Sequence, residues 1–258
     1  MIDAFGAPFD PSEYRRLVNV VFFPEVDSTN SVGRGLIDHA MREEVELAPT
    51  VIAAASQTRG RGRRDRPWLS PGGGVYATFV FHLPEEIRLS HVPLAAAIWI
   101  AEAASRSAGV DARLKWPNDV VCAGRKLAGV LTEAKTRGDE TIVAVGIGVN
   151  ARGAPEAFDP RATTLEKEGT RPSSEAGFFR ELCLACDRYL QAPGQAGVVE
   201  AWLSRSRLAP GDGIRLTVEN GTEREVAGEF AGLTPDGLLR VRVDGAEVVV
   251  ASGEVQTW

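Results

Sequence analysis

The sequence predicts an α+β fold, in which a mixed sheet with flanking helices precedes a small all-β unit. β-prone and helix-prone segments mix over most of the chain, and its 258 residues allow a large and a small domain. Hairpin signals crowd the last part, where three dipeptides can adopt positive φ: Asn220-Gly221, Asp236-Gly237 and Asp244-Gly245. We therefore expect a larger domain over residues 1–208 and a β-barrel over residues 209–258.

The first elements of this fold are expected on either side of an arginine-rich segment. Residues 49–57, PTVIAAASQ, are mostly β-branched or small and predict a buried strand that ends at this segment. Residues 74–83 predict the strand beyond it. Residues 93–109 have helix-forming composition, with proline at the start and glycine at the end.

Three strand-like segments and two helices are expected before the barrel. The strands are 112–119, 125–135 and 141–150, separated by Gly, Pro, Asn and Asp. The helices are 173–191, with Ser173 or Ser174 as its N-cap, and 197–208.

Composition excludes several classes of protein. A net charge of −6 gives no global attraction to nucleic acid or anionic lipid. The amino terminus lacks the features of a signal peptide, and the best apolar run is interrupted by Glu102. Cys183 and Cys186 form a lone CxxC pair, which we interpret as small core residues because zinc would need two more ligands. We expect a reduced, cytoplasmic protein.

Residues 58–68, TRGRGRRDRPW, are called the arginine loop here. The loop holds five arginines and one acid, Asp65, so its like charges need either solvent or an anion. Arginine presents a planar fork that suits carboxylate or phosphate, and glycine lets the backbone approach a ligand closely.

Four interpretations of the arginine loop compete. A solvated basic loop is the simplest, although such runs usually contain lysine. A dinucleotide fingerprint fails because Asp65 replaces the last glycine and Pro67 stands where the helix should begin, and no Walker sequence is present. Nucleic-acid binding lacks a helix-turn-helix or a second basic stripe. Capture of a small polyanion in an enzyme site predicts further polar clusters that complete a pocket.

Such clusters are present at the ends of the expected elements. The DSTN sequence (27–30) would serve either as a helix cap or as a set of short hydrogen-bonding groups, and Gln57 adds an amide. The KWPNDV sequence (115–120) supplies a lysine, an amide and a carboxylate. The RKLAGVLTE sequence (125–133) and the GIGVN sequence (146–150) add Lys126, glycines and an asparagine.

These motifs, in this order, closely resemble biotin protein ligases over about residues 22–150, and the resemblance extends through the small β-barrel. It implies a class II synthetase-like catalytic domain and an SH3-like β-barrel. It also implies a two-step reaction. Biotin and ATP give biotinyl-5′-AMP and pyrophosphate, and the biotinyl group then passes to one lysine of the biotin carrier domain of a carboxylase.

The resemblance also assigns roles to individual residues. The expected catalytic residues are Lys126, Arg61 and Arg63. The expected biotin-binding residues are Ser28, Thr29, Asn30, Gln57, Gly60, Arg61, Gly62, Arg63, Thr78, Lys126, Gly129 and Gly146. The expected ATP-binding residues are Arg63, Arg64, Arg66, Trp68, Asn118, Lys126 and Asn150. Mg²⁺ is expected on the phosphates, with Asp119 as the one candidate carboxylate; Asp119 could equally be a general base or a turn residue.

The sequence departs from the family pattern at two points. Asp65 stands where the loop often has glycine, and an acid there would loosen loop closure or pair with Arg63 or Arg64. Phe158 is the one aromatic residue in the segment after GIGVN that could cover adenine. About 20 residues precede the VVFFPEVDSTN sequence, too few for a winged helix, so we expect the form of the family without a DNA-binding domain.

Several alternatives stay open from the sequence. A lipoate or octanoate ligase of the same broad fold is the nearest, and a nucleic-acid-binding regulator or a non-catalytic binder of small molecules belongs to other classes. Neither a membrane nor nucleic acid is expected as a partner, and assembly as a homodimer stays open.

Overall fold

The computed structural model describes residues 1–192, 197–219 and 223–257. Among the described residues the strands form two separate sheets. The first sheet has seven strands in the order β1-β2-β3-β7-β6-β5-β4, with β1 parallel to β2 and every other neighbouring pair antiparallel. Its strands are β1 (Asn19–Val26), β2 (Thr50–Gln57), β3 (Gly74–His82), β4 (Arg113–Lys115), β5 (Asp119–Cys122), β6 (Arg125–Arg137) and β7 (Glu140–Asn150).

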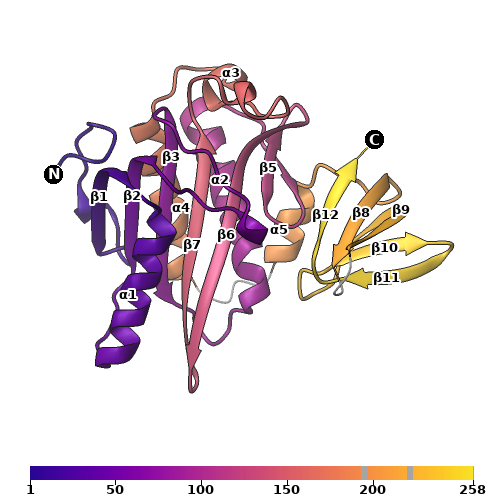
Figure 1. Ribbon diagram of the computed structural model, residues 1–258, viewed down its shortest axis with the longest axis horizontal. Coiled ribbons are helices and arrows are strands. Elements are labelled where there is room, and N and C mark those ends of the chain that lie inside the picture. Colours follow the sequence, from indigo (N-terminus) through magenta and orange to yellow (C-terminus); the bar gives the residue numbers. More distant parts are fainter. Residues whose placement is uncertain (193–196, 220–222, 258) are drawn as a thin grey trace.

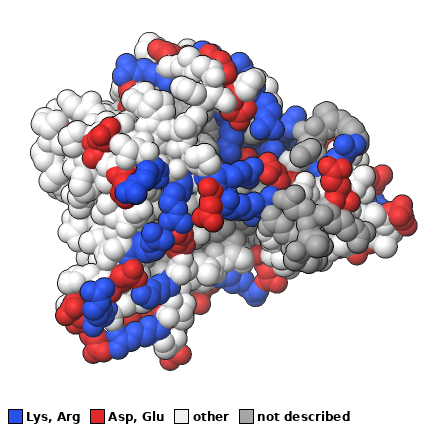
Figure 2. Space-filling model, in the orientation of Figure 1, with Lys and Arg blue, Asp and Glu red and all other residues white. Residues whose placement is uncertain are grey.

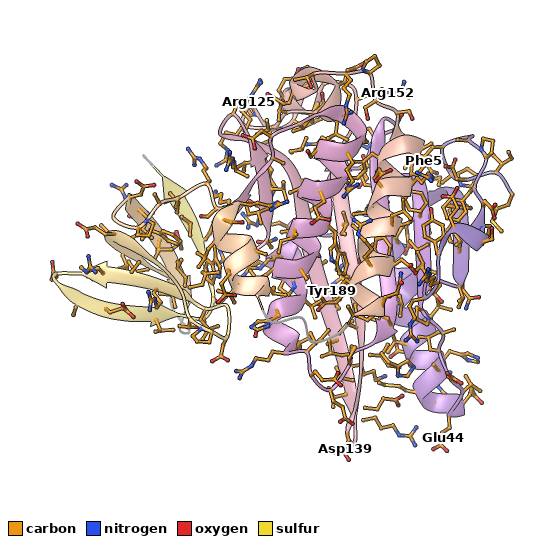
Figure 3. The ribbon with its side chains drawn as sticks, turned by 180° about the vertical axis from the view of Figure 1, so that it is seen from behind. Phe5, Glu44, Arg125, Asp139, Arg152 and Tyr189 are labelled. Carbon is orange, nitrogen blue, oxygen red and sulfur yellow. The ribbon has the colours of Figure 1, made fainter. Side chains whose placement is uncertain are left out.

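Helices cover both faces of the first sheet (Figure 1). They are α1 (Thr29–Glu43), α2 (Val92–Ala108), the short α3 (Leu165–Glu168), α4 (Glu175–Gln191) and α5 (Val198–Ser204). Helix α1 packs on one face, against β2, β3, β6 and β7, while α2 and α4 lie side by side on the other face (Figure 3). No helix in the described part of the chain is long and apolar enough to cross a membrane.

The second sheet is antiparallel, in the order β11-β10-β9-β8-β12. Its strands are β8 (Gly213–Glu219), β9 (Glu223–Leu233), β10 (Leu239–Val243), β11 (Ala246–Val250) and β12 (Gly253–Thr257). The predicted hairpin at Asp244-Gly245 is confirmed, with φ of 50° and 81° at the two residues. The predicted turn at Asp236-Gly237 joins β9 to β10, whereas Asn220-Gly221 lies outside the described residues. The prediction of a mixed sheet followed by a small all-β unit is confirmed.

Alternation along β3 and β7 separates the two faces of the first sheet. Odd-numbered residues such as Phe79 and Val145 are buried in the large core under α2 and α4. Even-numbered residues face α1, where Val80 and Ile142 pack under the helix. Near the N-terminal end of α1 the even-numbered residues of β7 are Gly146, Gly148 and Asn150. These small or polar residues do not fill the space above the sheet, so a hollow is left there.

Several local predictions are confirmed and others needed correction. Ser174 is the N-cap of α4, and its Oγ accepts from the N–H of Gly177 at 3.1 Å. Cys183 and Cys186 are fully buried core residues on this helix. The helix predicted at 197–208 ends at Ser204, because the chain beyond it pairs with β4: Leu114 N donates to Arg205 O at 2.8 Å.

Candidate active site

A cavity of about 470 Å³ occupies the hollow beside the first turn of α1. Its floor is made by glycines of β6 and β7, because Gly129 lies opposite Gly148 in register and Gly146 is two residues away on the same face. The predicted residues that line it are Ser28, Thr29, Asn30, Gln57, Arg61, Gly62, Arg63, Arg66, Trp68, Asn118, Asp119, Lys126, Gly129, Gly146 and Asn150. Three other predicted residues, Gly60, Arg64 and Thr78, are not among the lining residues.

One end of the cavity is a buried polar group, called the head-group pocket here: Ser28, Thr29, Asn30, Gln57 and Thr78. Thr29 donates from both its backbone N–H and its hydroxyl to Gln57 Oε1, at 2.8 and 3.2 Å. Thr78 Oγ1 donates to Asn30 Oδ1 at 2.7 Å and lies 2.9 Å from Thr29 Oγ1. Thr78 is fully buried beneath these residues, so it positions them from behind.

The head-group pocket exists because α1 begins at Thr29 and approaches the sheet closely. Ser28 is the N-cap, but its side chain makes no capping hydrogen bond and faces the cavity. A Cβ on Gly33 would lie 3.0 Å from Thr78 Cγ2, so glycine is what permits the close approach of the helix. The DSTN sequence is thus both a helix start and a row of polar groups.

The arginine loop folds back on itself as a small hairpin. Trp68 N donates to Gly60 O at 2.9 Å, and Gly62 N donates to Arg66 O at 2.8 Å. At the tip, Arg64 and Asp65 have left-handed φ of 58° and 54°. Residues other than glycine rarely adopt this backbone conformation, although aspartate tolerates it better than most. Asp65, where biotin protein ligases often have glycine, therefore has a φ that glycine would adopt without strain.

Carboxylates from other parts of the chain lie against the arginines of this loop. Arg61 Nη1 is 3.5 Å from Glu133 Oε1, and Arg59 Nη2 is 3.3 Å from Asp27 Oδ2. Glu254 of β12 holds the other side, with its Oε2 at 3.1 Å from Arg66 Nη1 and 3.9 Å from Arg64 Nη1.

This arrangement differs from the expectation that the loop needs solvent or a bound anion, because the protein itself supplies anions. Figure 2 shows the result: Lys and Arg side chains gather between the two sheets with acidic side chains among them. Of the two expectations for Asp65, the pairing is found with a different arginine: its Oδ1 lies 4.0 Å from Arg61 Nη2, and its side chain is 97% exposed. An effect of Asp65 on loop closure stays a prediction.

The cationic end of the cavity is built around Lys126. Lys126 Nζ lies 2.7 Å from Asp119 Oδ1 and 5.2 Å from the centre of the Trp68 ring. Arg63 Nη1 donates to Asn118 Oδ1 at 3.1 Å and to Gly253 O at 3.4 Å, so the loop also contacts the second sheet. Lys126, the arginine loop and Asn150 share one cavity, although 89 residues separate Arg61 from Asn150.

Trp68 packs onto the glycine floor. A Cβ on Gly148 would lie 2.5 Å from the indole Nε1, and one on Gly129 would lie 3.1 Å from the ring. The Nε1 atom is buried without a hydrogen-bond partner among the described residues. The two glycines therefore make room for an aromatic wall between the head-group pocket and Lys126.

Two arginines of the lining belong to none of the sequence motifs. Arg161 and Arg207 are brought to the cavity by backbone pairing, since Lys126 N donates to Arg161 O at 2.6 Å and Arg207 N donates to Leu114 O at 2.9 Å. Lys115 also lines the cavity; burial lowers its pKa, although Asp119 and Glu254 oppose the shift.

The segment after β7 closes the remaining side. Arg152 lines the cavity and binds Glu175 through Nε at 2.8 Å and Nη2 at 2.6 Å. Figure 3 shows Arg152 and Arg125 at one end of the sheet and Asp139 at the other. Phe158 lines the same side and is 64% exposed. Across the described residues, no group of three or more His, Cys, Asp and Glu is arranged to hold a metal ion.

Comparisons with known proteins agree with this geometry. The family model described as "Biotin/lipoate A/B protein ligase family" matches residues 22–150. The biotin–[acetyl-CoA-carboxylase] ligase of Paracoccus denitrificans is 34% identical over 84% of this chain and 96% of its own length. The bifunctional ligase/repressor BirA of Bacillus subtilis is 29% identical over 80% of this chain and 66% of its own length.

Solved structures are similar over nearly the whole chain. The biotin protein ligase of Aquifex aeolicus in complex with biotin and ATP superposes with a TM-score of 0.72 at 28% identity, covering 92% of this chain and 97% of the ligase. With the sequence matches, this likeness leads to one conclusion: the chain belongs to the biotin/lipoate A/B protein ligase family.

Proposed function

We propose that the protein activates biotin with ATP, giving biotinyl-5′-AMP and pyrophosphate, and then transfers the biotinyl group to a lysine of the carrier domain of a carboxylase. The observation that carries this proposal is a single cavity with two different ends. One end offers short, buried hydrogen-bonding groups for a polar ring system, and the other gathers Arg61, Arg63 and Lys126 for a carboxylate and phosphates.

The proposed roles follow the two ends of the cavity. The head-group pocket, with Gly129 and Gly146 as its floor, holds the ring system of biotin. Gly60, Arg61, Gly62, Arg63 and Lys126 meet the biotin carboxylate and the reacting phosphate. The ATP contacts would be Arg63, Arg64, Arg66, Trp68, Asn118, Lys126 and Asn150, with Phe158 over the adenine.

In the first step the cations of the cavity reduce the repulsion between the biotin carboxylate and the phosphates of ATP. Two unit charges about 4 Å apart repel by ~1 kcal/mol in water and by several times more in a drier site. Arg61, Arg63 and Lys126 offset this repulsion when the biotin carboxylate approaches the α-phosphate. They also stabilise the charge that develops at the phosphorus, and this differential interaction raises the rate.

The second step needs a neutral lysine amine on the carrier. The amine attacks the acyl carbon, the carbon–oxygen bond to the phosphate breaks, and AMP leaves with the electron pair. Asp119 is the carboxylate of the lining nearest Lys126, so it is a candidate to accept the amine proton. No nucleophile on the enzyme is required, because the mixed anhydride is already activated.

Mg²⁺ belongs to this proposal through the phosphates. The described residues contain no ready metal site, and the cavity carboxylates Asp119 and Glu254 are paired with cations. We propose that the ion enters with ATP and reduces the charge of the triphosphate.

We also propose residues 1–208 and 209–258 as the two domains. A cytoplasmic location and assembly as a homodimer remain predictions.

Biotin-dependent exchange of pyrophosphate into ATP tests the proposal. Arg63→Ala should lower the exchange rate by about 10²–10³, as expected for the loss of a group that stabilises transition-state charge. Arg59→Ala is the matched control, because Arg59 belongs to the same loop, is 80% exposed and pairs with Asp27 outside the lining. Equal effects of the two substitutions would reject the assignment.

A lipoate or octanoate ligase is the second candidate, since the matched family model covers both activities. The polar head-group pocket favours a ureido ring over a plain acyl chain. Exchange that depends on lipoate, with no response to biotin, would decide for the alternative. A shift of DNA at low salt in the absence of biotin would instead favour a nucleic-acid-binding regulator.

A further inference from the structure

Glu133 joins the head-group pocket to the arginine loop. It lies on β6 opposite Ala144, on the face that carries Gly129 and Leu131, and its side chain is 25% exposed. Its Oε2 accepts from Asn30 Nδ2 at 3.0 Å, and its Oε1 lies 3.5 Å from Arg61 Nη1. One rigid carboxylate therefore fixes a pocket residue and a loop cation relative to each other.

The charge of Glu133 also sets the orientation of the Asn30 amide. An ionised carboxylate only accepts hydrogen bonds, so Asn30 must turn its NH₂ group toward Glu133. The Asn30 Oδ1 is then left to accept from Thr78. The NH₂ group also donates to Leu131 O at 3.3 Å, so with a neutral amide at position 133 this longer bond would be what still orients Asn30 toward β6.

A second chain of hydrogen bonds connects the head-group pocket to the C-terminal end of the arginine loop, at Trp68. Gln57 binds Thr29 through Oε1, and its Nε2 donates to Ser70 Oγ at 2.8 Å. Ser70 Oγ donates in turn to Trp68 O at 3.0 Å. The head-group pocket is thus tied to Arg61 through Glu133 and to Trp68 through Ser70.

We propose that Glu133 is a positioning residue for biotin: it orients Asn30 toward the ring system and places Arg61 for the carboxylate. This inference rests on the proposed function. It predicts that Glu133 acts mainly on biotin, because Asn30 belongs to the head-group pocket, whereas the ATP contacts Arg63 and Lys126 are held by Asn118 and Asp119.

The simpler alternative is a solvated ion pair without a role in binding. Glu133 Oε1 also lies 3.8 Å from Arg34 Nη1, whose side chain is 51% exposed, and exposed pairs of this kind contribute little. However, the second oxygen of Glu133 is bound to Asn30, which is 4% exposed, and losing that bond would leave the buried NH₂ group with the longer 3.3 Å bond to Leu131 O among the described residues.

Glu133→Gln tests the proposal with two ligands. By titration calorimetry we expect the biotin Kd to rise about tenfold, as for the loss of one charge-assisted hydrogen bond, while the ATP Kd stays within about twofold. Arg34→Ala is the control, because it removes the exposed partner of Glu133 and leaves Asn30 and Arg61 in place; its biotin Kd should match the wild type. An unchanged biotin Kd in Glu133→Gln, or equal losses for both ligands, would overturn the proposal.

Two further measurements separate this inference from the proposed function. Glu133→Ala, Arg61→Ala and the double variant should be non-additive in biotin Kd, and additivity would contradict the coupling. Without any ligand, trypsin should cleave after Arg61 severalfold faster in Glu133→Gln than in the wild type. If the wild type lacks biotin-dependent exchange, the proposed function fails, while the cleavage rates still decide whether Glu133 holds the loop.

Discussion

Gly146→Ala adds one methyl group, yet it should displace Asn30 in the head-group pocket and so weaken both stability and biotin binding. A Cβ at this position would lie 1.9 Å from Asn30 Oδ1, about 1.5 Å short of an ordinary contact at 3.4 Å. The sheet cannot move away, because β7 is hydrogen-bonded to β3 and β6 on either side. The asparagine must therefore shift.

The magnitude follows from the hydrogen bonds that the shift breaks. Asn30 would lose its 2.7 Å bond from Thr78 and its 3.0 Å bond to Glu133, both at a site that is nearly closed to solvent. Each buried polar group left unsatisfied costs about 1–3 kcal/mol, so we expect the free energy of unfolding to fall by ~2–4 kcal/mol. The biotin Kd should rise at least about tenfold for the same reason.

Urea unfolding and calorimetry with biotin are the assays, and Gly35→Ala is the matched control. Gly35 lies within α1, where an added Cβ meets nothing within 4 Å, so alanine should stabilise the helix by about 0.5–1 kcal/mol. If Gly146→Ala unfolds at the same urea concentration as the wild type and binds biotin normally, the close packing of Asn30 on β7 is not what shapes the pocket.

Three further predictions concern other contacts. Burial raises the pKa of Asp187, but bonds from the N–H groups of residues 15–17 outweigh it and leave this pKa below its usual value. The stability that Asp187 contributes is therefore present above about pH 4 and lost as pH falls below it. Asp187→Asn should have a lower free energy of unfolding than the wild type at pH 7, and this free energy should fall less between pH 5 and 3. Equal falls in the two proteins would contradict the assignment. Glu254→Gln should raise the ATP Kd severalfold by weakening the contact that holds Arg66, leaving biotin binding unchanged; an unaltered ATP Kd would show that Glu254 does not position the loop. Asp65→Asn and Asp65→Gly should both lower the ATP Kd by about twofold, since the exposed charge is screened; an effect of glycine alone would mean that the backbone, and not the charge, matters.

The fold was predictable where local chemistry decides it. The Asp244-Gly245 hairpin and the glycine-ended α2 follow from residues that favour those conformations. Helix α1 was not assigned from the sequence because Gly33 and Gly35 weaken its helical pattern. The structure shows why Gly33 stands there, since an added Cβ would lie 3.0 Å from Thr78 Cγ2 and 3.1 Å from Val80 Cγ2, tighter than ordinary packing.

The candidate site was predictable only as far as its motifs reach. Asn30, Lys126 and Asn150 stand in recognisable motifs, and they line one cavity. Glu254 and Arg207 belong to no such motif: Glu254 lies on β12, which pairs with β8, and Arg207 follows α5 and is held by a backbone hydrogen bond to Leu114 of β4. The ion pairs of the arginine loop could not be predicted either: Asp27 and Glu133 stand in the motifs, but a pair between distant residues leaves no local pattern.

Trp68 gives the cavity an optical signal of its own. Its half-buried indole packs against two glycines and lies 5.2 Å from Lys126 Nζ, and its N–H has no hydrogen-bond partner among the described residues. A ligand that enters must change the polarity around this ring and around Trp116, which lines the same cavity, whereas Trp99 and Trp202 are buried in the core at 4% and 1% exposure. The emission spectrum of the unlabelled protein should therefore shift on ligand entry, so the order and rate of substrate arrival become measurable by stopped-flow mixing.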